Sequence, residues 1–520
     1  MDTSTSMEAA AGSALRGIGT LGELFAWRVG RTPQALAYRQ YDRAAGAWRG
    51  YSWSEIQLRV GCWQRALSAQ TLGAGARVGV LLPNGVDAVC ADQALQSLGL
   101  VAVPMHALDN PASIRYILDD CQVALLLVAS PQQWQAIADC GPLPEHLRQV
   151  VTVQACDAGP AERRPAVVSL AAWLERPGEP GAIASRAAGA DLAAIVHTSG
   201  TTGRPKGVML SHANVLANLR GLMARVPLRA DDVFLSVLPL SHTFERTVGY
   251  YLPLAAGASV AYARSMALLA DDLAAIRPTV LVAVPRIDEK FHAALSARVA
   301  GAGAAICGGA PLPAATAQGL LAMGLPLLQG YGMTECAPVV ATNGIDDNWP
   351  ASVGRPLAGC EVRLGVRDEP QVRSASVMLG YWGRPEDSAR VLGADGWFGT
   401  GDQAVVEQGR IRIVGRIKDI LVTSTGEKIA AATVEQAILG DPLFAQAMVM
   451  GDNRPYLSAQ LPHYGAPRAA CALTEPWTVE NSLLTPTLKL KREALMARYA
   501  VRIAAMYAAR SSQPSPDLVH

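Results

Sequence analysis

The sequence predicts an α/β fold, because three features recur along most of the chain. Short apolar runs of strand length alternate with stretches of helical periodicity; residues 77–82, 86–98 and 101–103, for example, form one expected βαβ unit. The expected strands are apolar throughout, which is typical of parallel sheets covered on both faces. Half of the 520 residues are apolar, which is enough for a large core. We therefore expect a parallel, doubly wound sheet in this part of the chain.

The same alternation continues on both sides of the βαβ unit. Apolar residues at helical spacing predict helices over residues 21–29 and 51–67. Glycine and proline turns between short runs predict a small β-barrel or distorted sheet over residues 352–414. The remaining expected strands, which extend the first sheet and form a second one, cover residues 123–128, 150–153, 193–197, 233–238, 259–262, 280–284 and 304–307.

A charged step after Arg416 marks the expected domain boundary. We expect a large N-terminal domain of two parallel αβ sheets with the small β-barrel-like subdomain, followed by a small, mobile α+β C-terminal domain. The expected segments are a disordered lead over 1–20, the large domain over 21–415, the C-terminal domain over 416–510 and a tail over 511–520.

Overall charge and cysteine content exclude several classes of function. The 45 Lys and Arg residues balance 44 Asp and Glu residues, so no bulk field attracts nucleic acid or an anionic membrane. The nine cysteines form no CxxC pair or zinc-like cluster. No signal peptide and no apolar run long enough to span a membrane is visible. These features predict a cytoplasmic protein with at most peripheral membrane contact.

A hydroxyl- and glycine-rich loop, residues 198–207, follows the apolar run 192–196. Glycines let backbone N–H groups approach phosphate oxygens, hydroxyls add donors and a lysine adds positive charge, so the loop suits a triphosphate. It is not a Walker A motif, because Pro205 precedes Lys206 and Gly207 follows it. A flexible linker is the alternative. The residues expected to contact the nucleotide are Thr198, Ser199, Gly200, Thr201, Thr202, Gly203 and Lys206.

This loop resembles the signature loop of the AMP-binding, adenylate-forming superfamily, which includes acyl-CoA synthetases, luciferases and peptide-synthetase adenylation domains. Similar motifs continue in the family's order at residues 308–312, 331–335 and 400–402, although each alone would be an ordinary turn. The resemblance implies that the first two segments flank adenine and contact phosphate, and that the third binds ribose. The residues so assigned are Gly308, Gly309, Ala310, Tyr331, Gly332, Thr334, Asp402 and Arg416.

The resemblance also implies a magnesium ion beside the triphosphate. Glu335 would hold it with a hard carboxylate oxygen, and Thr198 would add a hydroxyl oxygen. Residues 484–492 are similar to the C-terminal lysine segment of long-chain enzymes, which makes Lys489 the expected catalytic lysine and Lys491 the second candidate. The alternative for both lysines is a solvated, basic helix start.

The segment Leu238-Pro-Leu-Ser-His-Thr-Phe-Glu-Arg246 resembles the part of long-chain acyl-CoA synthetases that gates the acyl pocket. His242 and Phe244 would line or close that pocket, whereas a core aromatic beside a capping histidine is the alternative. Residues 378–386 and 395–398 also resemble the fatty-acyl branch. The resemblance thus implies a catalytic set of Lys489, Thr198, Glu335 and His242.

The activity implied is a two-step ligation that uses ATP, Mg²⁺ and coenzyme A. A fatty-acid carboxylate attacks the α-phosphorus of ATP, and a thiol then attacks the acyl-AMP while the C-terminal domain turns about a hinge at 416–418. The protein mainly positions the reactants and neutralises negative charge, partly through Lys206 and Lys489.

Two other functions stay open, because residues 453–480 are shorter than the matching part of long-chain synthetases. One is a fatty-acyl-AMP ligase that loads an acyl carrier protein instead of CoA. The other is a noncatalytic acyl- or nucleotide-binding homologue. The presence of Lys206, Glu335, Asp402, Arg416 and Lys489 argues against the noncatalytic alternative.

Overall fold

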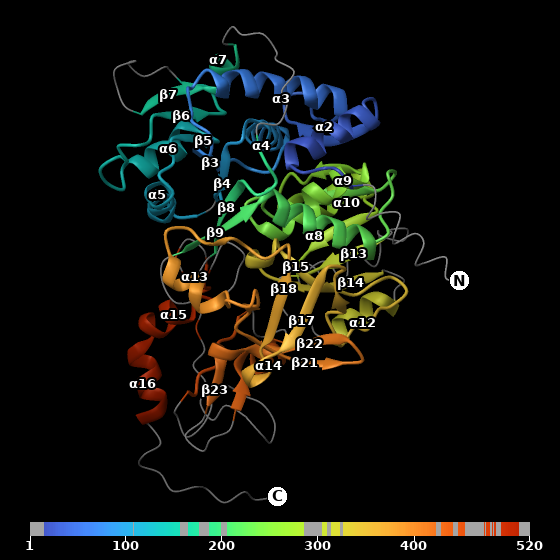
Figure 1. Ribbon diagram of the computed structural model, residues 1–520. Coiled ribbons are helices and arrows are strands. Elements are labelled where there is room, and N and C mark those ends of the chain that lie inside the picture. Colours follow the sequence, from blue (N-terminus) through green and yellow to red (C-terminus); the bar gives the residue numbers. More distant parts are fainter. Residues whose placement is uncertain are drawn as a thin grey trace, which may run out of the picture.

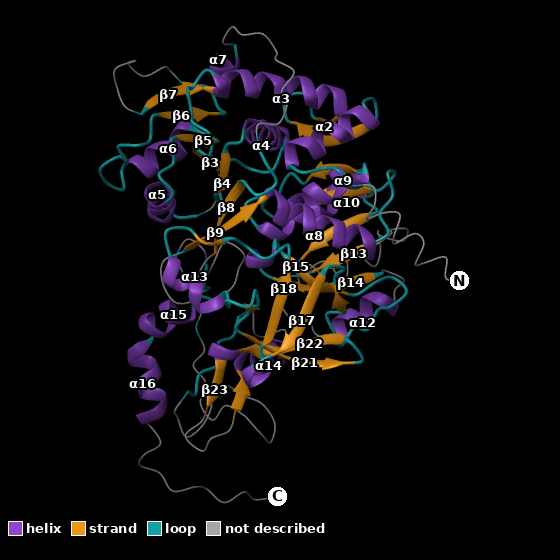
Figure 2. Cartoon of the chain, viewed as in Figure 1, coloured by secondary structure: helices purple, strands orange, loops and turns teal. Residues whose placement is uncertain are grey.

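Two large sheets flanked by helices form the body of the protein, and the C-terminal elements lie at one end of it (Figure 1). Figure 2 shows helices beside the strands of both sheets. This arrangement confirms the predicted α/β class. The computed structural model describes residues 15–107, 109–156, 165–175, 187–198, 205–284, 304–308, 314–322, 326–422, 428–439, 446–452, 473, 475–478, 481, 483–484 and 490–508.

The first sheet has eight described strands in the order β19-β9-β8-β4-β3-β5-β6-β7. Six of these strands, β3 to β8, run parallel, as predicted. The edge formed by β9 and β19 is antiparallel, because β9 returns directly from β8 as a hairpin. The strands are β3 (Arg77–Leu81), β4 (Val101–Pro104), β5 (Leu125–Val128), β6 (Gln149–Thr152), β7 (Ala166–Ser169), β8 (Leu192–Thr198), β9 (Lys206–Ser211) and β19 (Gly380–Tyr381).

The second sheet has nine described strands in the order β16-β15-β14-β13-β12-β10-β11-β1-β2. Its centre is parallel, and its two edges are antiparallel. The strands are β1 (Leu36–Asp42), β2 (Ala47–Ser52), β10 (Val233–Ser236), β11 (Ser259–Tyr262), β12 (Val280–Ala283), β13 (Ala304–Cys307), β14 (Leu327–Gly332), β15 (Val339–Thr342) and β16 (Arg355–Pro356).

Short antiparallel strands follow within residues 352–414, although β16 and β19 of this range join the two large sheets. The remaining strands form a three-stranded sheet of β17 (Cys360–Leu364), β18 (Pro370–Ser374) and β20 (Phe398–Gly399), and a hairpin of β21 (Asp402–Glu407) and β22 (Arg410–Arg416). A second hairpin of β23 (Ile420–Val422) and β24 (Lys428–Ala430) opens the C-terminal part.

The helices begin and end at recognisable signals, and α4 shows this most clearly. Gly85 precedes it, and Gly99 ends it in a left-handed conformation with φ of +66°, which glycine adopts without strain. The α-helices are α2 (Leu21–Arg31), α3 (Trp53–Ser68), α4 (Val86–Leu98), α5 (Pro111–Asp120), α6 (Pro131–Ala138), α7 (Leu170–Leu174), α8 (His212–Arg225), α9 (Leu252–Ala256), α10 (Leu269–Ile276), α12 (Ala314–Ala322), α13 (Pro385–Val391), α14 (Ala431–Leu439), α15 (Arg492–Arg498) and α16 (Ala500–Ala508). The other helical segments are the π-helix η1 (Glu245–Tyr251) and the 3₁₀ turns η2 (Met266–Leu268), η3 (Thr334–Cys336), η4 (Val366–Asp368) and η5 (Ile417–Asp419). None of the described helices is both long and apolar enough to cross a bilayer.

Residues 15–20 correct the prediction of a disordered lead over 1–20. Leu15 and Ile18 are buried, and Arg220 of α8 donates a 2.9 Å hydrogen bond to the carbonyl of Ile18. Thr20 caps the amino end of α2 together with Glu23. The prediction relied on the Ala, Ser and Gly content of residues 1–20 and therefore missed the buried Leu15 and Ile18.

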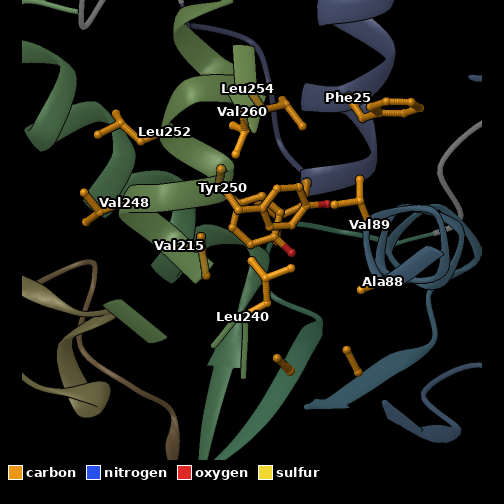
Figure 3. Packing of buried hydrophobic residues seen from close by; sticks show 14 of the residues in the cluster. Phe25, Ala88, Val89, Val215, Leu240, Val248, Tyr250, Leu252, Leu254 and Val260 are labelled. Carbon is orange, nitrogen blue, oxygen red and sulfur yellow. The ribbon is translucent and has the colours of Figure 1, made fainter. Parts of the chain in front are cut away.

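A polar joint lies inside the apolar core between the two sheets. Figure 3 shows Tyr250 of η1 packed among apolar side chains of several elements, including Val89 of α4. Its hydroxyl donates a 3.1 Å hydrogen bond to Asp92 of α4, and that of Tyr251 donates a 2.6 Å bond to the same carboxylate. Arg246 completes the joint with a buried ion pair to Asp92. Burial of this charge is tolerated because Arg246, Tyr250 and Tyr251 each donate a hydrogen bond to the carboxylate.

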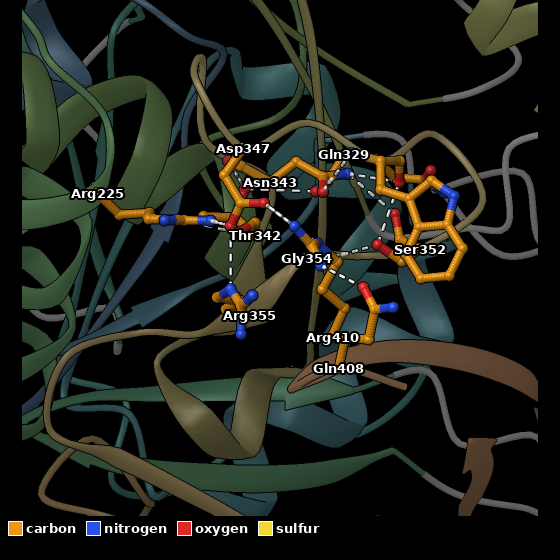
Figure 4. A network of polar contacts seen from close by, with 11 residues as sticks. Arg225, Gln329, Thr342, Asn343, Asp347, Ser352, Gly354, Arg355, Gln408 and Arg410 are labelled. Carbon is orange, nitrogen blue, oxygen red and sulfur yellow. Dashed lines mark hydrogen bonds and ion pairs between the residues drawn. The ribbon is translucent and has the colours of Figure 1, made fainter. Parts of the chain in front are cut away.

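A second charged cluster joins three distant elements through Asp347 (Figure 4). Its carboxylate contacts Arg225 at 2.9 Å, Arg355 at 3.0 Å and Arg410. Burial alone would raise the pKa of Asp347, but the hydrogen bonds from the three guanidinium groups outweigh it and lower the pKa to about 2. Asp347 thereby ties the end of α8 to β16 and β22.

Replacement of this hub should lower stability with a defined pH dependence. Asp347→Asn should lose about 1–2 kcal/mol at pH 7, because the folded-state pKa lies below the ordinary value of 3.8. The carboxylate stabilises the fold fully above pH 4, and this contribution disappears as pH falls from about 4 toward 2. Urea unfolding midpoints at pH 7, 5 and 3.5 measure the effect, with the exposed neighbour variant Asp346→Asn as control. Equal stability of the two variants at pH 7 would contradict this role.

Candidate functional site

The candidate site lies where strands of the first sheet end, and it begins at the base of the glycine-rich loop. In the β8–β9 ladder Thr198 pairs with Lys206, so the two ends of the loop lie side by side. The Thr198 hydroxyl points to the Lys206 carbonyl at 3.5 Å. The loop residues between them, Ser199, Gly200, Thr201, Thr202 and Gly203, lie outside the described residues.

Lys206 is held by two residues that sequence reasoning did not single out. Its Nζ lies 3.0 Å from an Asp387 carboxylate oxygen and 5.1 Å from the centre of the Tyr381 ring. The hydrogen bond from Lys206 keeps the pKa of Asp387 below its usual range. Asp387 follows directly after the 378–386 motif, but spacing alone gave no sign that it would face the lysine.

Tyr381 also links the lysine to the predicted magnesium ligand. Its hydroxyl donates a 2.9 Å hydrogen bond to Oε1 of Glu335. Burial, followed by the charge of Glu335, raises the pKa of Tyr381 well above its usual value, so the hydroxyl remains a donor at neutral pH. Glu335 and Thr198 offer the carboxylate and hydroxyl oxygens that magnesium prefers, so their chemistry fits the ion implied by the sequence.

Three residues assigned to the adenosine part come together although 85 positions separate the first from the last. The Tyr331 hydroxyl donates a 2.6 Å hydrogen bond to Asp402, and Arg416 Nε lies 3.3 Å from the other carboxylate oxygen. The ladder of β21 and β22 pairs Asp402 with Arg416 directly, which explains their contact. The Tyr331 hydroxyl and the Asp402 carboxylate are polar groups of the kind that hydrogen-bond to the hydroxyls of a ribose.

The proposed acyl segment lies against the adenine segments. A Cβ placed on Gly308 would come within 3.0 Å of the Phe244 ring, so this glycine allows the ring to approach the end of β13. The Thr243 hydroxyl lies 3.3 Å from that of Thr334. His242 Nδ1 accepts the Phe244 backbone N–H at 3.3 Å, which orients the imidazole. Gly309 and Ala310 lie outside the described residues.

Gly332 has a steric reason to be glycine. A Cβ at this position would stand 2.0 Å from the Pro338 carbonyl oxygen, where the β14–β15 pairing is irregular. The absence of a side chain therefore lets the strand carrying Tyr331 turn into Thr334 and Glu335.

The C-terminal lysine segment approaches the large domain. Lys489 lies outside the described residues, but Lys491 is described and directly precedes α15 as its N-cap residue. Burial raises the pKa of Asp109 to about 6, although the positive charge of nearby Lys491 acts in the opposite direction. Asp109 lies in the segment between β4 and α5, so the start of α15 lies close to this segment of the large domain.

The fold and this arrangement of nucleotide-type residues define an adenylate-forming enzyme. The profile of the AMP-binding enzyme family matches residues 25–382, and that of the AMP-binding enzyme C-terminal domain matches residues 418–466. The chain belongs to the AMP-binding enzyme family.

Its relatives act on several kinds of acid. The chain is 26% identical to the long-chain-fatty-acid–CoA ligase FadD15 of Mycobacterium bovis over 89% of this chain and 93% of that protein. It is 32% identical to a feruloyl-CoA synthase of Amycolatopsis over 83% and 86%. A long-chain-fatty-acid–[acyl-carrier-protein] ligase of Arabidopsis thaliana is 27% identical over 61% and 62%. The solved structure of the anthranilate CoA ligase AuaEII with anthranoyl-AMP has the same fold, with a TM-score of 0.80, 23% identity and coverage of 94% and 98%.

The contact of Asp402 with Tyr331 and Arg416 predicts a role in nucleotide affinity. Asp402→Asn should weaken ATP binding about tenfold, because a charged hydrogen-bond acceptor is lost. Calorimetric titration of ATP into the folded variant measures this. Glu407→Gln, at the exposed end of the same strand, is the matched control. Wild-type affinity in Asp402→Asn would remove this residue from the site.

Proposed function

We propose that the protein activates fatty acids with ATP, forming an acyl-AMP and pyrophosphate, and then transfers the acyl group to coenzyme A. The observation that carries the proposal is a pair of contact groups, one around Lys206 and Glu335 and one around Asp402, which the segment 331–335 connects along the chain. Tyr381 links the first two residues, and Tyr331 and Arg416 hold the third. A noncatalytic binding protein would not need one tyrosine to contact both the Glu335 carboxylate and the Lys206 ammonium group.

In the first step the protein has to hold two anions close together. Lys206 attracts the triphosphate, and Asp387 and Tyr381 restrict its position so that the charge is already placed when the reaction begins. Magnesium, when bound with ATP at Glu335 and Thr198, would supply further charge neutralisation. Lys489 would add positive charge where the carboxylate meets the α-phosphate. No protein nucleophile is required, because the carboxylate itself attacks phosphorus.

The acid is proposed to be a fatty acid of medium to long chain. Phe244 is buried beside Gly308, so the segment 238–246 presents an apolar side chain next to the adenine segment. In this proposal His242 and Thr243 bound the carboxylate end of the acid. The similarity to FadD15 supports a fatty acid, while the similarity to feruloyl-CoA synthase makes an aryl acid the competing substrate.

The acceptor is proposed to be CoA, with an acyl carrier protein as the alternative. The C-terminal profile ends at residue 466, and the sequence over residues 453–480 is shorter than the matching part of long-chain synthetases, which leaves the carrier protein open as acceptor. The similarity to an acyl-carrier-protein ligase supports the alternative. Parallel assays with CoA and with a phosphopantetheinylated carrier protein distinguish the two.

A pyrophosphate-release screen over carboxylic acids tests the substrate class. Activity should rise with chain length, because each buried CH₂ adds about 0.8 kcal/mol, or roughly fourfold in kcat/KM, until the pocket is filled. Acetate, benzoate, ferulate and an amino acid serve as comparison acids. A clear preference for any of these four would overturn the fatty-acid assignment.

A pair of lysine variants tests the two half-reactions separately. Lys489→Ala should lose most acyl-AMP formation, about a hundredfold or more, because charge stabilisation of the transition state is removed. The same variant, supplied with synthetic acyl-AMP and CoA, should retain most thioester formation. Lys491→Ala is the matched control and should keep adenylation activity. Equal losses in both assays, or a larger loss in Lys491→Ala, would contradict the role of Lys489.

A further inference from the structure

A polar cluster at the carboxyl end of α5 contacts the residues that flank the glycine-rich loop. Nε2 of His197 lies 3.5 Å from Oδ2 of Asp120, and the hydroxyl of Tyr116 lies 3.2 Å from Oδ1. Arg384 approaches the same carboxylate at 3.8 Å and donates a 2.5 Å hydrogen bond to the Tyr116 hydroxyl. Asp120 is thus the common partner of a strand residue, a helix residue and a residue before α13.

The cluster reaches both ends of the loop. His197 immediately precedes Thr198, and its imidazole packs against Gly207, where a Cβ would lie 3.2 Å from Nε2. On the other side the Tyr116 hydroxyl lies 3.4 Å from the Pro205 carbonyl, so its single proton can go to this oxygen or to Asp120.

Trp382 connects the carboxyl end of α5 to β9 through two hydrogen bonds. Its indole N–H donates a 3.0 Å hydrogen bond to the Asp120 carbonyl, and its backbone N–H donates a 2.7 Å bond to the Gly207 carbonyl. The residues that flank the loop are therefore held at His197, Pro205 and Gly207 by contacts that all return to the carboxyl end of α5. Trp382 directly follows Tyr381, so the same short segment orients Lys206 and Glu335.

Asp120, Cys121 and His197 also have the donor types of a transition-metal site, with their donor atoms within 4.8 Å of one another. Protein contacts already account for this arrangement. Asp120 takes its hydrogen bonds from His197 and Tyr116 and faces the positive charge of Arg384. Burial raises the pKa of Cys121 to about 12, which keeps the thiol protonated at neutral pH.

We propose that Asp120 is a positioning residue for ATP, acting through His197 and Tyr116 on the two ends of the glycine-rich loop. It touches neither substrate nor reacting atom. Its carboxylate fixes the imidazole beside Thr198 and the hydroxyl beside Pro205, so the backbone on both sides of the loop is set before the triphosphate arrives. This role rests on the proposed adenylating function of the loop.

Asp120→Asn and His197→Gln test the proposal, together with the double variant. Each single change should raise KM for ATP about fivefold and weaken binding of a nonhydrolysable ATP analogue equally, while kcat for pyrophosphate release changes less than about twofold. KM for ATP in the double variant should be no higher than in the more impaired single variant, because both changes break the same contact between His197 and Asp120. Asp119→Asn, the exposed neighbour on α5, should behave like wild type.

Several outcomes would overturn the positioning role. These are wild-type KM and analogue affinity in Asp120→Asn, additive losses in the double variant, or a fall in kcat with unchanged KM. A rise in KM on treating the wild-type protein with a chelator at saturating Mg²⁺, abolished in Cys121→Ala, would assign the cluster to a metal instead. If none of the carboxylic acids supports pyrophosphate release by the wild-type protein, the proposed function fails. Binding of the ATP analogue still tests the role of Asp120 in that case.

Discussion

The buried ion pair between Asp92 and Arg246 is the interaction on which the arrangement of the site depends. Asp92 lies on α4, which packs with the first sheet, and Arg246 lies on η1, which connects two strands of the second sheet. Removal of one partner would leave an uncompensated charge in the core, which is far more damaging than the net gain from the intact pair. The pair therefore fixes how the two sheets meet more than it adds to stability.

The position of η1 transmits this constraint to the site. The acyl segment 238–246 runs directly into the π-helix η1. Such helices are rare overall, but those that occur are often found at functional sites. Thr247 of the same helix donates a 3.1 Å hydrogen bond to the Ala337 carbonyl, and Thr243 meets Thr334. Asn218 of α8 adds hydrogen bonds to the carbonyls of Cys336 and Val339. The acyl segment and the Tyr331 segment are thus held in register by groups outside the motifs themselves.

Local signals in the sequence were sufficient for much of the fold. Gly85 and Gly99 mark the two ends of α4, and the apolar run before Thr198 predicts β8. The helix expected from residue 51 begins only at Trp53, because Ser52 caps it and Tyr51 belongs to β2, where it pairs with Tyr38 of β1. The antiparallel edges were missed, since an apolar strand gives no indication of its partner's direction.

The site was predictable as a set of residue types but not as a set of contacts. Motif order identifies Glu335, Asp402 and Arg416, and the structure supplies partners such as Tyr381 and Asp387, which depend on how distant strands pair. Asp120 had no sequence signal at all, because an aspartate at a helix end is usually a solvated residue. Its importance follows only from the meeting of α5 with β8 and the segment before α13.

The central claim is that a carboxylate oxygen of the substrate attacks the α-phosphorus of ATP at this site. The most direct measurement uses a fatty acid with ¹⁸O in both carboxylate oxygens, incubated with the protein, ATP, Mg²⁺ and CoA, followed by mass spectrometry of the products. The account predicts AMP that carries one ¹⁸O atom and pyrophosphate that carries none. Unlabelled AMP formed together with acyl-CoA, or label in inorganic phosphate, would contradict it.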